Sequence, residues 1–194
     1  MSNIGLVILA AGASARMGTP KQLLRYREQS LIRHVIEVAI ASVCHPIIVI
    51  LGANAECIKL EIASLDIQLI ENPLWVEGMS TSVRSGVEAL KASNLDVEAV
   101  VLMVCDQPFV STQLINQLVE NYRTTGRLIV ASEYAGTLGV PALFHSSLFP
   151  ELTALGGDVG ARRVIKQHTL EAFGIPFPEG AIDLDTPKDY EQLY

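Results

Sequence analysis

Short continuous apolar runs alternate along this chain with longer segments in which apolar residues recur every three or four positions. The continuous runs are typical of strands buried on both faces, and the periodic segments are typical of helices with one apolar face. We therefore expect strands at 4–9, 47–51, 67–70, 99–104 and 128–131, and helices at 31–40, 55–64, 80–92 and 112–124. Three strand–helix–strand passages in succession predict an α/β fold, with a mainly parallel sheet and helices on both faces.

Residues suited to helix N-termini precede these helical segments. The expected N-caps are Ser30, Asn54 and Ser111, with Ser80 or Thr81 for the helix at 80–92. A short terminal helix is also expected, with Thr186 as its N-cap, Pro187 as its first residue and Asp189 in its first turn.

The last third of the chain has a less regular pattern. Residues 136–144 hold two glycines and a proline around an apolar stretch, a glycine-rich loop follows at 155–160, and 160–168 predicts a helix. The sequence contains neither an internal repeat nor a low-complexity linker. We therefore expect residues 1–194 to form a single domain.

The composition limits the functions that such a fold can serve. The chain has 194 residues, 49% of them hydrophobic and 18% charged, and its net charge is −7. These proportions are typical of a folded globular protein. Without a basic stripe we expect no binding to nucleic acid, and no apolar run approaches the ~20 residues that span a membrane. Cys44, Cys57 and Cys105 lack metal-type spacing, which favours a reduced, cytoplasmic setting and disfavours a zinc site.

A loop with glycine and positive charge follows the first predicted strand. Residues 9–24 read LAAGASARMGTPKQLL, so small residues surround Arg16 and Lys21. Such a loop lets backbone N–H groups approach an anion, and the two cations add to the attraction. Gly12 and Gly18 have the spacing of neither the Walker A motif nor the Gly-x-Gly-x-x-Gly motif. The loop therefore predicts a polyphosphate site of another kind, and the alternative is an ordinary turn with solvated cations.

Further polar residues follow the predicted strands. Ligands of open parallel sheets bind outside the carboxyl ends of the strands, where the loop at 10–21, Asn72 and Asp106 are expected. Asp106 could cap a following helix or hold Mg²⁺, which prefers one or two carboxylates with phosphate oxygens and water. Asp183 and Asp185 have the same two interpretations, and alternation in an extended stretch would point both to one side.

Other side chains have both a structural and a chemical interpretation. The segment at 78–86 offers hydroxyl and N–H groups at a helix start, for capping or for recognition of a base or ribose, and Arg84 within it could contact phosphate or a surface carboxylate. The four histidines show no pairing and are expected to be structural or exposed. Cys105 has no evident base, so we expect no nucleophilic role, and Trp75 could pack on a ligand or anchor a loop.

Six motifs carry a resemblance that covers the chain from residue 4 onward. They are Leu9-Ala-Ala-Gly-x-Ser-x-Arg-Met-Gly-x-x-Lys21, Gly78-Met-Ser-x-Ser82, Cys105-Asp-Gln-Pro108, Gly139-Val-Pro-Ala-Leu-Phe144, Gly157-Asp-x-Gly-Ala-Arg162 and Asp183-Leu-Asp-Thr-Pro187. Together they resemble the MobA-like nucleotidyltransferases, and among these the molybdenum cofactor cytidylyltransferase branch. The resemblance implies a three-layer, Rossmann-like fold of the nucleotide-diphospho-sugar transferase type.

The resemblance also implies a reaction and roles for particular residues. A terminal phosphate of the molybdopterin cofactor attacks the α-phosphorus of CTP, and pyrophosphate leaves. The implied catalytic residues are Arg16, Lys21 and Asp106, and the implied Mg²⁺ ligands are Asp106 and Asp185. The implied nucleotide-binding residues are Leu9, Ala10, Ala11, Gly12, Arg16, Lys21, Gly78, Ser80, Ser82 and Asp106. The residues implied for the pterin substrate are Gln107, Pro108, Gly139, Pro141, Gly157, Asp158 and Gly160.

The base and the class of function have alternatives. Ala10-Ala11-Gly12 is similar to the cytidylyl branch, whereas guanylyl members more often carry glycine in place of Ala11, so GTP is the alternative to CTP. A non-catalytic nucleotide-binding cofactor chaperone would not need Lys21 together with two carboxylates, and a nicotinamide-dependent oxidoreductase would need the absent glycine motif. The expected partners are the nucleotide, the molybdopterin cofactor and a molybdenum hydroxylase, with no membrane.

Overall fold

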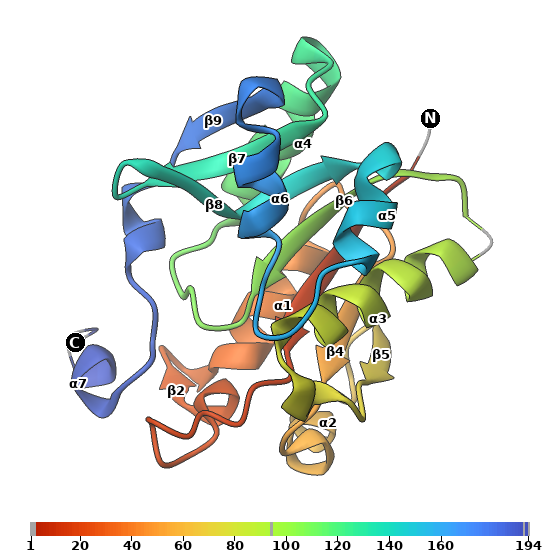
Figure 1. The fold of residues 1–194 in the computed structure, drawn as a ribbon. Coiled ribbons are helices and arrows are strands. Elements are labelled where there is room, and N and C mark those ends of the chain that lie inside the picture. The colour runs from red at the N-terminus through yellow and green to blue at the C-terminus, as the bar shows by residue number, and fades with distance from the viewer. Residues whose placement is uncertain (1–2, 94, 192, 194) are drawn as a thin grey trace.

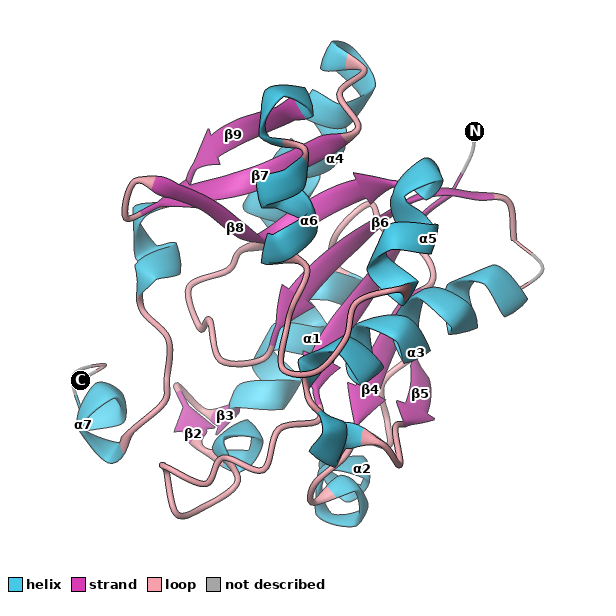
Figure 2. Ribbon diagram, viewed as in Figure 1, coloured by secondary structure: helices cyan, strands magenta, loops and turns pink. Residues whose placement is uncertain are grey.

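A seven-stranded sheet forms the centre of the computed structural model, which describes residues 3–93, 95–191 and 193 (Figures 1 and 2). Its strand order is β5-β4-β1-β6-β8-β7-β9. The strands are β1 Asn3–Ala10, β4 Ile47–Leu51, β5 Gln68–Glu71, β6 Val97–Val104, β7 Ile129–Tyr134, β8 Thr137–His145 and β9 Ala172–Pro176. A separate two-stranded hairpin pairs β2 Arg25–Tyr26 with β3 Gln29–Ser30.

Helices cover both faces of this sheet. They are α1 Leu31–Ile40, α2 Ala55–Ile62, α3 Met79–Ala92, α4 Thr112–Thr125, α5 Phe149–Thr153, α6 Arg162–Gln167 and α7 Pro187–Glu191. Buried side chains of α1, α2 and α4 pack with one face of the strands, and those of α3, α5 and α6 pack with the other. Figure 1 shows α3, α5 and α6 in front of the sheet and α1 and α4 behind it. The expected three-layer α/β arrangement is therefore confirmed.

The N-terminal half follows the apolar pattern closely. β5, β4, β1 and β6 are parallel neighbours, and every side chain of β4 is buried. Such strands read as continuous apolar runs because helices cover both of their faces. Ser30 and Ser111 cap α1 and α4 as expected, since each hydroxyl accepts the N–H of a residue in the first helical turn.

Two strands of the C-terminal half were not expected. β8 is antiparallel to both of its neighbours, β6 and β7, while β9 is parallel to β7 at the sheet edge. Pro141 lies in β8 where the pairing with β7 shifts register, and the Ser132 hydroxyl donates to the Pro141 carbonyl at 2.7 Å. Irregular pairing of this kind is what accommodates proline in a strand.

Two expected helix starts were wrong, and α2 begins where expected but without the expected side-chain cap. The residue before α3 is Gly78 with φ of +110°, so neither Ser80 nor Thr81 is the N-cap. Asn54 precedes α2 with φ of +62° but makes no capping hydrogen bond through its side chain. The helix expected at 160–168 begins at Arg162.

The C-terminal helix begins as expected. Thr186 and Asp189 bond reciprocally at the start of α7, each side chain accepting the backbone N–H of the other. In the described part of the chain, no helix combines the length and the apolar character that a membrane crossing requires.

Candidate active site

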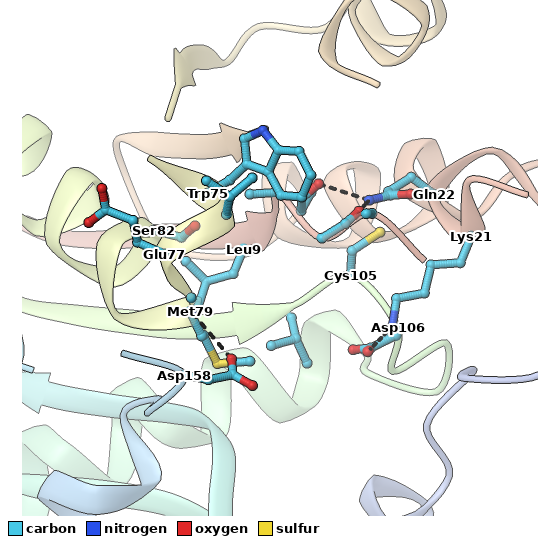
Figure 3. A pocket seen from close by; sticks show the side chains of 17 residues that line it. Leu9, Lys21, Gln22, Trp75, Glu77, Met79, Ser82, Cys105, Asp106 and Asp158 are labelled. Atoms are coloured by element: carbon cyan, nitrogen blue, oxygen red, sulfur yellow. Dashed lines mark hydrogen bonds and ion pairs between the residues drawn. The ribbon is translucent and has the colours of Figure 1, made fainter. Parts of the chain in front are cut away.

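The carboxyl ends of β1 and β6 open into a cavity of about 460 Å³ (Figure 3). The two strands are adjacent and parallel, so the segments that follow them meet at one edge of the sheet. The cavity is lined by residues 9–13, Lys21, Gln22, 75–79, Ser82, 104–106 and Asp158. The predicted convergence of the loop after β1 with Asp106 is therefore confirmed.

A buried glutamine holds the loop after β1. Gln22 is 1% exposed, and its Nε2 donates to the carbonyl oxygens of Ala10 and Gly12, both at 2.9 Å. Ser14, with φ of +56°, donates from its hydroxyl to Gln22 Oε1 at 3.3 Å and accepts the N–H of Lys21 at 3.0 Å. These bonds fix the loop and the position from which Lys21 extends. Sequence reasoning missed Gln22, whose only signal is an amide between Lys21 and two leucines.

Lys21 joins two carboxylates from distant parts of the chain. Its Nζ lies 2.5 Å from Asp106 Oδ2 and 3.2 Å from Asp185 Oδ1. Burial alone would lower the pKa of Lys21, but the charges and hydrogen bonds of the two carboxylates raise it above its ordinary value. Lys21 is therefore a cation held at the end of the cavity.

Arg16 reaches the same cluster from outside. Its Nη2 donates to Asp185 Oδ2 at 2.8 Å, while its side chain is 72% exposed. Arg16 does not line this cavity, nor does it line the smaller cavity that adjoins it and is described below. An exposed pair of this kind contributes little stability, but it places a second positive charge beside Asp185.

Asp106 has the properties of a cation ligand. Its Oδ1 is buried and has no hydrogen-bond partner among the described residues, while Oδ2 binds Lys21. Capping of a following helix is excluded, because α4 begins at Thr112 and its cap is Ser111. An orphaned carboxylate oxygen is costly unless a ligand or ion satisfies it.

Asp183 and Asp185 lie near Asp106, but they differ in their surroundings. Asp185 binds Lys21, whereas Asp183 lines a neighbouring cavity. Burial, together with the charges of Asp106 and Asp185, raises the pKa of Asp183. Within the described residues, no group of three or more His, Cys, Asp or Glu side chains is arranged to hold a metal ion. The unpartnered Oδ1 of Asp106 and the nearby carboxylate of Asp185 are oxygen donors of the kind that Mg²⁺ takes together with phosphate and water.

A second cavity of about 230 Å³ adjoins the first. Both cavities share Leu9, Met79, Val104 and Asp106 in their linings. The second is completed by Gln107, Tyr134, Gly139, Val140, Gly160, Ala161, Arg162 and Asp183. Ligands bound in the two cavities would meet at Asp106, beside Lys21.

The amide of Gln107 is fixed in the wall of the second cavity. Gln107 is 2% exposed, and its Nε2 donates to the Gly180 carbonyl at 3.0 Å and approaches the Tyr134 hydroxyl at 3.5 Å. Its Oε1 has no hydrogen-bond partner among the described residues. The Tyr134 hydroxyl in turn donates to the Val140 carbonyl at 3.0 Å. Sequence reasoning missed Tyr134, which no motif marks.

Gly78 and Gly157 pack backbone against backbone where α3 begins. A Cβ on Gly78 would lie 2.5 Å from the carbonyl carbon and oxygen of Gly157. Met79 N–H donates to Asp158 Oδ1 at 3.4 Å, and Figure 3 shows Asp158 beside Met79. Asp158 lines the first cavity, and its implied contact with the pterin substrate stays a prediction.

Several other expected site residues lie elsewhere. Pro108, Pro141 and Ser80 are buried and line neither cavity. Arg84 donates to the backbone carbonyls of Thr153 and Leu155 at 3.0 and 3.2 Å. It therefore ties α3 to the loop after α5.

The thiol of Cys105 is unsuited to nucleophilic attack. Burial, together with the charge of Asp106, raises its pKa well above the ordinary value, so the thiol stays protonated. This agrees with the expectation that Cys105 is not a nucleophile. Trp75 lines the first cavity, as one of its two interpretations required.

Comparison with known proteins places the chain in a protein family. A family model described as the MobA-like NTP transferase domain matches residues 6–172. Nicotine blue oxidoreductase of Paenarthrobacter nicotinovorans is 31% identical over 83% of this chain and 80% of its own. Purine catabolism protein PucB of Bacillus subtilis is 28% identical over 96% and 94%. Molybdenum cofactor cytidylyltransferase of Escherichia coli is 25% identical over 98% and 95%.

Solved structures with a similar fold and a related sequence are also known. A homologue of Rv0371c from Mycobacterium sp. strain JC1 has a TM-score of 0.83 at 30% identity, covering 98% of this chain and 94% of its own. Rv0371c of Mycobacterium tuberculosis, solved in complex with manganese, has a TM-score of 0.79 at 27% identity, covering 99% and 98%.

Proposed function

The chain belongs to the MobA-like NTP transferase family, and we propose that it joins CMP from CTP to the terminal phosphate of the molybdopterin cofactor. In this reaction an oxygen of the acceptor phosphate forms a bond to the α-phosphorus of CTP. The bond from that phosphorus to the bridging oxygen breaks, and pyrophosphate leaves. The observation that carries the proposal is the cluster that Lys21 forms with Asp185 and with Asp106, which lines both cavities.

The two cavities suit two substrates. The larger one follows the glycine-containing loop after β1, where backbone groups and Lys21 can hold a triphosphate. The smaller one has an aromatic wall from Tyr134 and the fixed amide of Gln107, which suit a flat heterocycle such as a pterin. Because both cavities reach Asp106, the acceptor phosphate and the α-phosphorus can meet there.

Lys21 would do most of the charge stabilisation that the protein supplies. Nucleotidyl transfer asks the protein to position groups and to stabilise developing charge, so it requires no covalent nucleophile. A lysine kept protonated by Asp106 and Asp185 can neutralise charge on the α-phosphate during transfer. The buried, protonated thiol of Cys105 fits a mechanism without an enzyme nucleophile.

Asp106 and Asp185 would hold a divalent cation, proposed to be Mg²⁺. The unpartnered Oδ1 of Asp106 and the proximity of Asp185 support this role, as does the manganese complex of the similar Rv0371c. When bound, the cation would draw charge from the phosphate oxygens. Asp106 and Asp185 position it, and Arg16 keeps the Asp185 carboxylate in place from the solvent side.

Support for cytosine comes from the first loop. Ala11 is 7% exposed and lines the first cavity. A methyl group close to a base changes the binding free energy by about 1–3 kcal/mol, which is enough for a preference between two nucleotides. GTP is the alternative nucleotide, since a guanylyltransferase would use the same cluster of Lys21, Asp106 and Asp185.

A second candidate function is a redox reaction. It is favoured by the 31% identity to a protein named nicotine blue oxidoreductase. Against it stands the Lys21–Asp106–Asp185 cluster, which a hydride transfer does not need. Binding titrations with NAD(P)H, CTP and GTP separate the two candidates. Tight binding of NAD(P)H, with no binding of CTP or GTP, would favour the redox reaction.

The experiment that tests the proposal supplies each nucleotide separately. Purified protein receives Mg²⁺, the molybdopterin cofactor and either CTP or GTP, and the loss of each nucleotide is followed by chromatography. We expect CTP to be consumed only when the acceptor is present. Consumption of neither nucleotide would contradict the proposed function, and consumption of GTP alone would replace cytosine with guanine.

A further inference from the structure

A buried asparagine at the end of β5 has a fixed orientation. Asn72 is 2% exposed, and its Oδ1 accepts the N–H of Leu74 at 3.0 Å. Its Nδ2 donates to the hydroxyls of Thr81 at 2.8 Å and Ser82 at 3.0 Å. The N–H of Leu74 requires an acceptor, so a flipped amide would set two donors against each other. Both hydrogens of Nδ2 are therefore committed to the two hydroxyls of α3.

This orientation determines how Ser82 uses its proton. Because Ser82 Oγ accepts from Asn72, it cannot direct its own proton back to that amide. Among the described residues, no hydrogen bond donated by Ser82 is found. Ser82 is 4% exposed and lines the first cavity, where Figure 3 places it on the side formed by α3. Its proton is thus free, as far as the described residues go, to be donated to a ligand inside the cavity.

The hydroxyl of Thr81 differs from that of Ser82 in where its proton goes. Thr81 accepts from the same amide, but its hydroxyl is within reach of the carbonyls of Gly78 at 2.9 Å and Leu74 at 3.0 Å. Thr81 does not line the cavity, and its proton stays within the turn before α3. The Thr81 hydroxyl therefore donates within its own turn, whereas the Ser82 hydroxyl faces the cavity.

We propose that Asn72 is a positioning residue that makes Ser82 a hydrogen-bond donor to the base of the bound nucleotide. The inference rests on the proposed function and deepens it, because it bears on the choice of base. Cytosine offers two acceptors, its carbonyl oxygen and its unprotonated ring nitrogen, to a donor approaching that edge. The corresponding edge of guanine carries two donors beside one acceptor. A hydroxyl constrained to donate favours cytosine.

The isosteric substitution Asn72→Asp tests the inference. A carboxylate only accepts hydrogen bonds, so at about pH 8 the Ser82 proton would turn toward residue 72 and its lone pairs would face the cavity. The added negative charge acts on the triphosphates of CTP and GTP alike, so it cancels in their affinity ratio. The experiment is calorimetric titration of the full chain with CTP and with GTP, in Mg²⁺ and without acceptor.

We expect wild type to bind CTP more tightly than GTP, and Asn72→Asp to shift the ratio of dissociation constants toward GTP by about tenfold or more. Ser82→Ala should weaken CTP without creating a preference for GTP. Thr81→Val is the matched control: it removes the other hydroxyl that Asn72 binds, so it should lower stability but keep the nucleotide ratio.

Other outcomes overturn the inference. An unchanged ratio in folded Asn72→Asp would contradict it, and if that variant does not fold, unchanged CTP affinity in Ser82→Ala would do the same. Tighter binding of GTP by wild type would contradict the inference but leave nucleotidyl transfer standing. Binding of neither nucleotide by wild type would remove the proposed function, and the inference with it.

Discussion

The ammonium nitrogen of Lys21 lies 2.5 Å from a carboxylate oxygen of Asp106, although the two residues are 85 positions apart. The pair connects the loop after β1 with the end of β6, and these strands are parallel neighbours. Strand adjacency therefore brings the cation and the carboxylate together at the edge of the sheet. Asp106 also borders both cavities, so under the proposed function the pair lies where the two substrates would react.

Lys21→Ala should lower turnover by about 10²–10³-fold with the fold intact, because one charge-stabilising group in a transition state contributes about that much. Steady-state release of pyrophosphate measures the change, and circular dichroism checks the fold. Lys59→Ala is the matched control, since Lys59 also binds two carboxylates, Glu56 and Glu71, but on the surface. Turnover near the wild-type rate in Lys21→Ala would remove the catalytic role of this lysine.

Asp106→Asn should abolish metal-dependent activity and weaken binding of Mn²⁺ by about tenfold or more. The reason is that the amide supplies one neutral oxygen in place of a carboxylate with an unpartnered, buried Oδ1. Electron paramagnetic resonance of free Mn²⁺ measures the affinity in the presence of CTP. Asp66→Asn removes an exposed carboxylate and serves as the control. Equal Mn²⁺ affinity in wild type and Asp106→Asn would argue against a metal ligand at this position.

Gly78→Ala should disturb the wall of the first cavity. The new Cβ meets the Gly157 carbonyl at 2.5 Å, and the backbone keeps φ of +110°. Gly136→Ala is the control, since φ is +69° there but nothing lies within 4 Å of the new Cβ. We expect about 1 kcal/mol of lost stability for Gly136→Ala and roughly 2–4 kcal/mol for Gly78→Ala, measured by urea unfolding. Equal losses would mean that the close approach to Gly157 is unimportant.

Stability should depend on pH through a surface histidine. His168 Nε2 lies 2.9 Å from Glu151 Oε2 and its Nδ1 lies 3.0 Å from Glu171 Oε2. The hydrogen bond that His168 donates to the Glu151 carboxylate raises the pKa of His168, and Glu171 adds to the effect. A pKa raised above its unfolded value gives stability that is complete below the unfolded pKa of about 6.5 and is lost as pH rises through the folded pKa.

The thermal midpoint of wild type should therefore fall between about pH 6 and pH 8 relative to His168→Gln. Differential scanning calorimetry of both proteins across this range measures the difference. High salt should shrink it, because exposed charges are screened. A constant difference between the two midpoints across the range would contradict a titrating contact at His168.

Much of the fold follows from the apolar pattern, but not its C-terminal part. The runs that became β1, β4 and β6 are uninterrupted because helices cover both faces of these strands. β8 contains Gly139 and Pro141, and it pairs antiparallel with β7, which ends two residues before it, and with β6, which is distant in sequence. Its stability comes from those neighbours, so local pattern alone does not predict it.

The site was predictable where it depends on strand ends. Lys21 and Asp106 were identified from the loops after two apolar runs, and Asp185 was chosen over Asp183 by the family resemblance alone. In the folded chain Lys21 binds both carboxylates. Gln22 and Tyr134 were not identified, because each acts by bonding to a backbone carbonyl that only the folded chain brings near. The same holds for the bond from Asn72 to Ser82, although the position of Asn72 at a strand end was expected.

The proposed reaction is the transfer of CMP from CTP to the terminal phosphate of the molybdopterin cofactor. Its most direct test is mass spectrometry of the reaction of wild type and Lys21→Ala with CTP, Mg²⁺ and the molybdopterin cofactor, with pyrophosphate measured in parallel. The proposal predicts a cytosine dinucleotide product formed with one pyrophosphate per product by wild type, and about 10²–10³-fold more slowly by Lys21→Ala. Absence of any dinucleotide from wild type with CTP or GTP would contradict it.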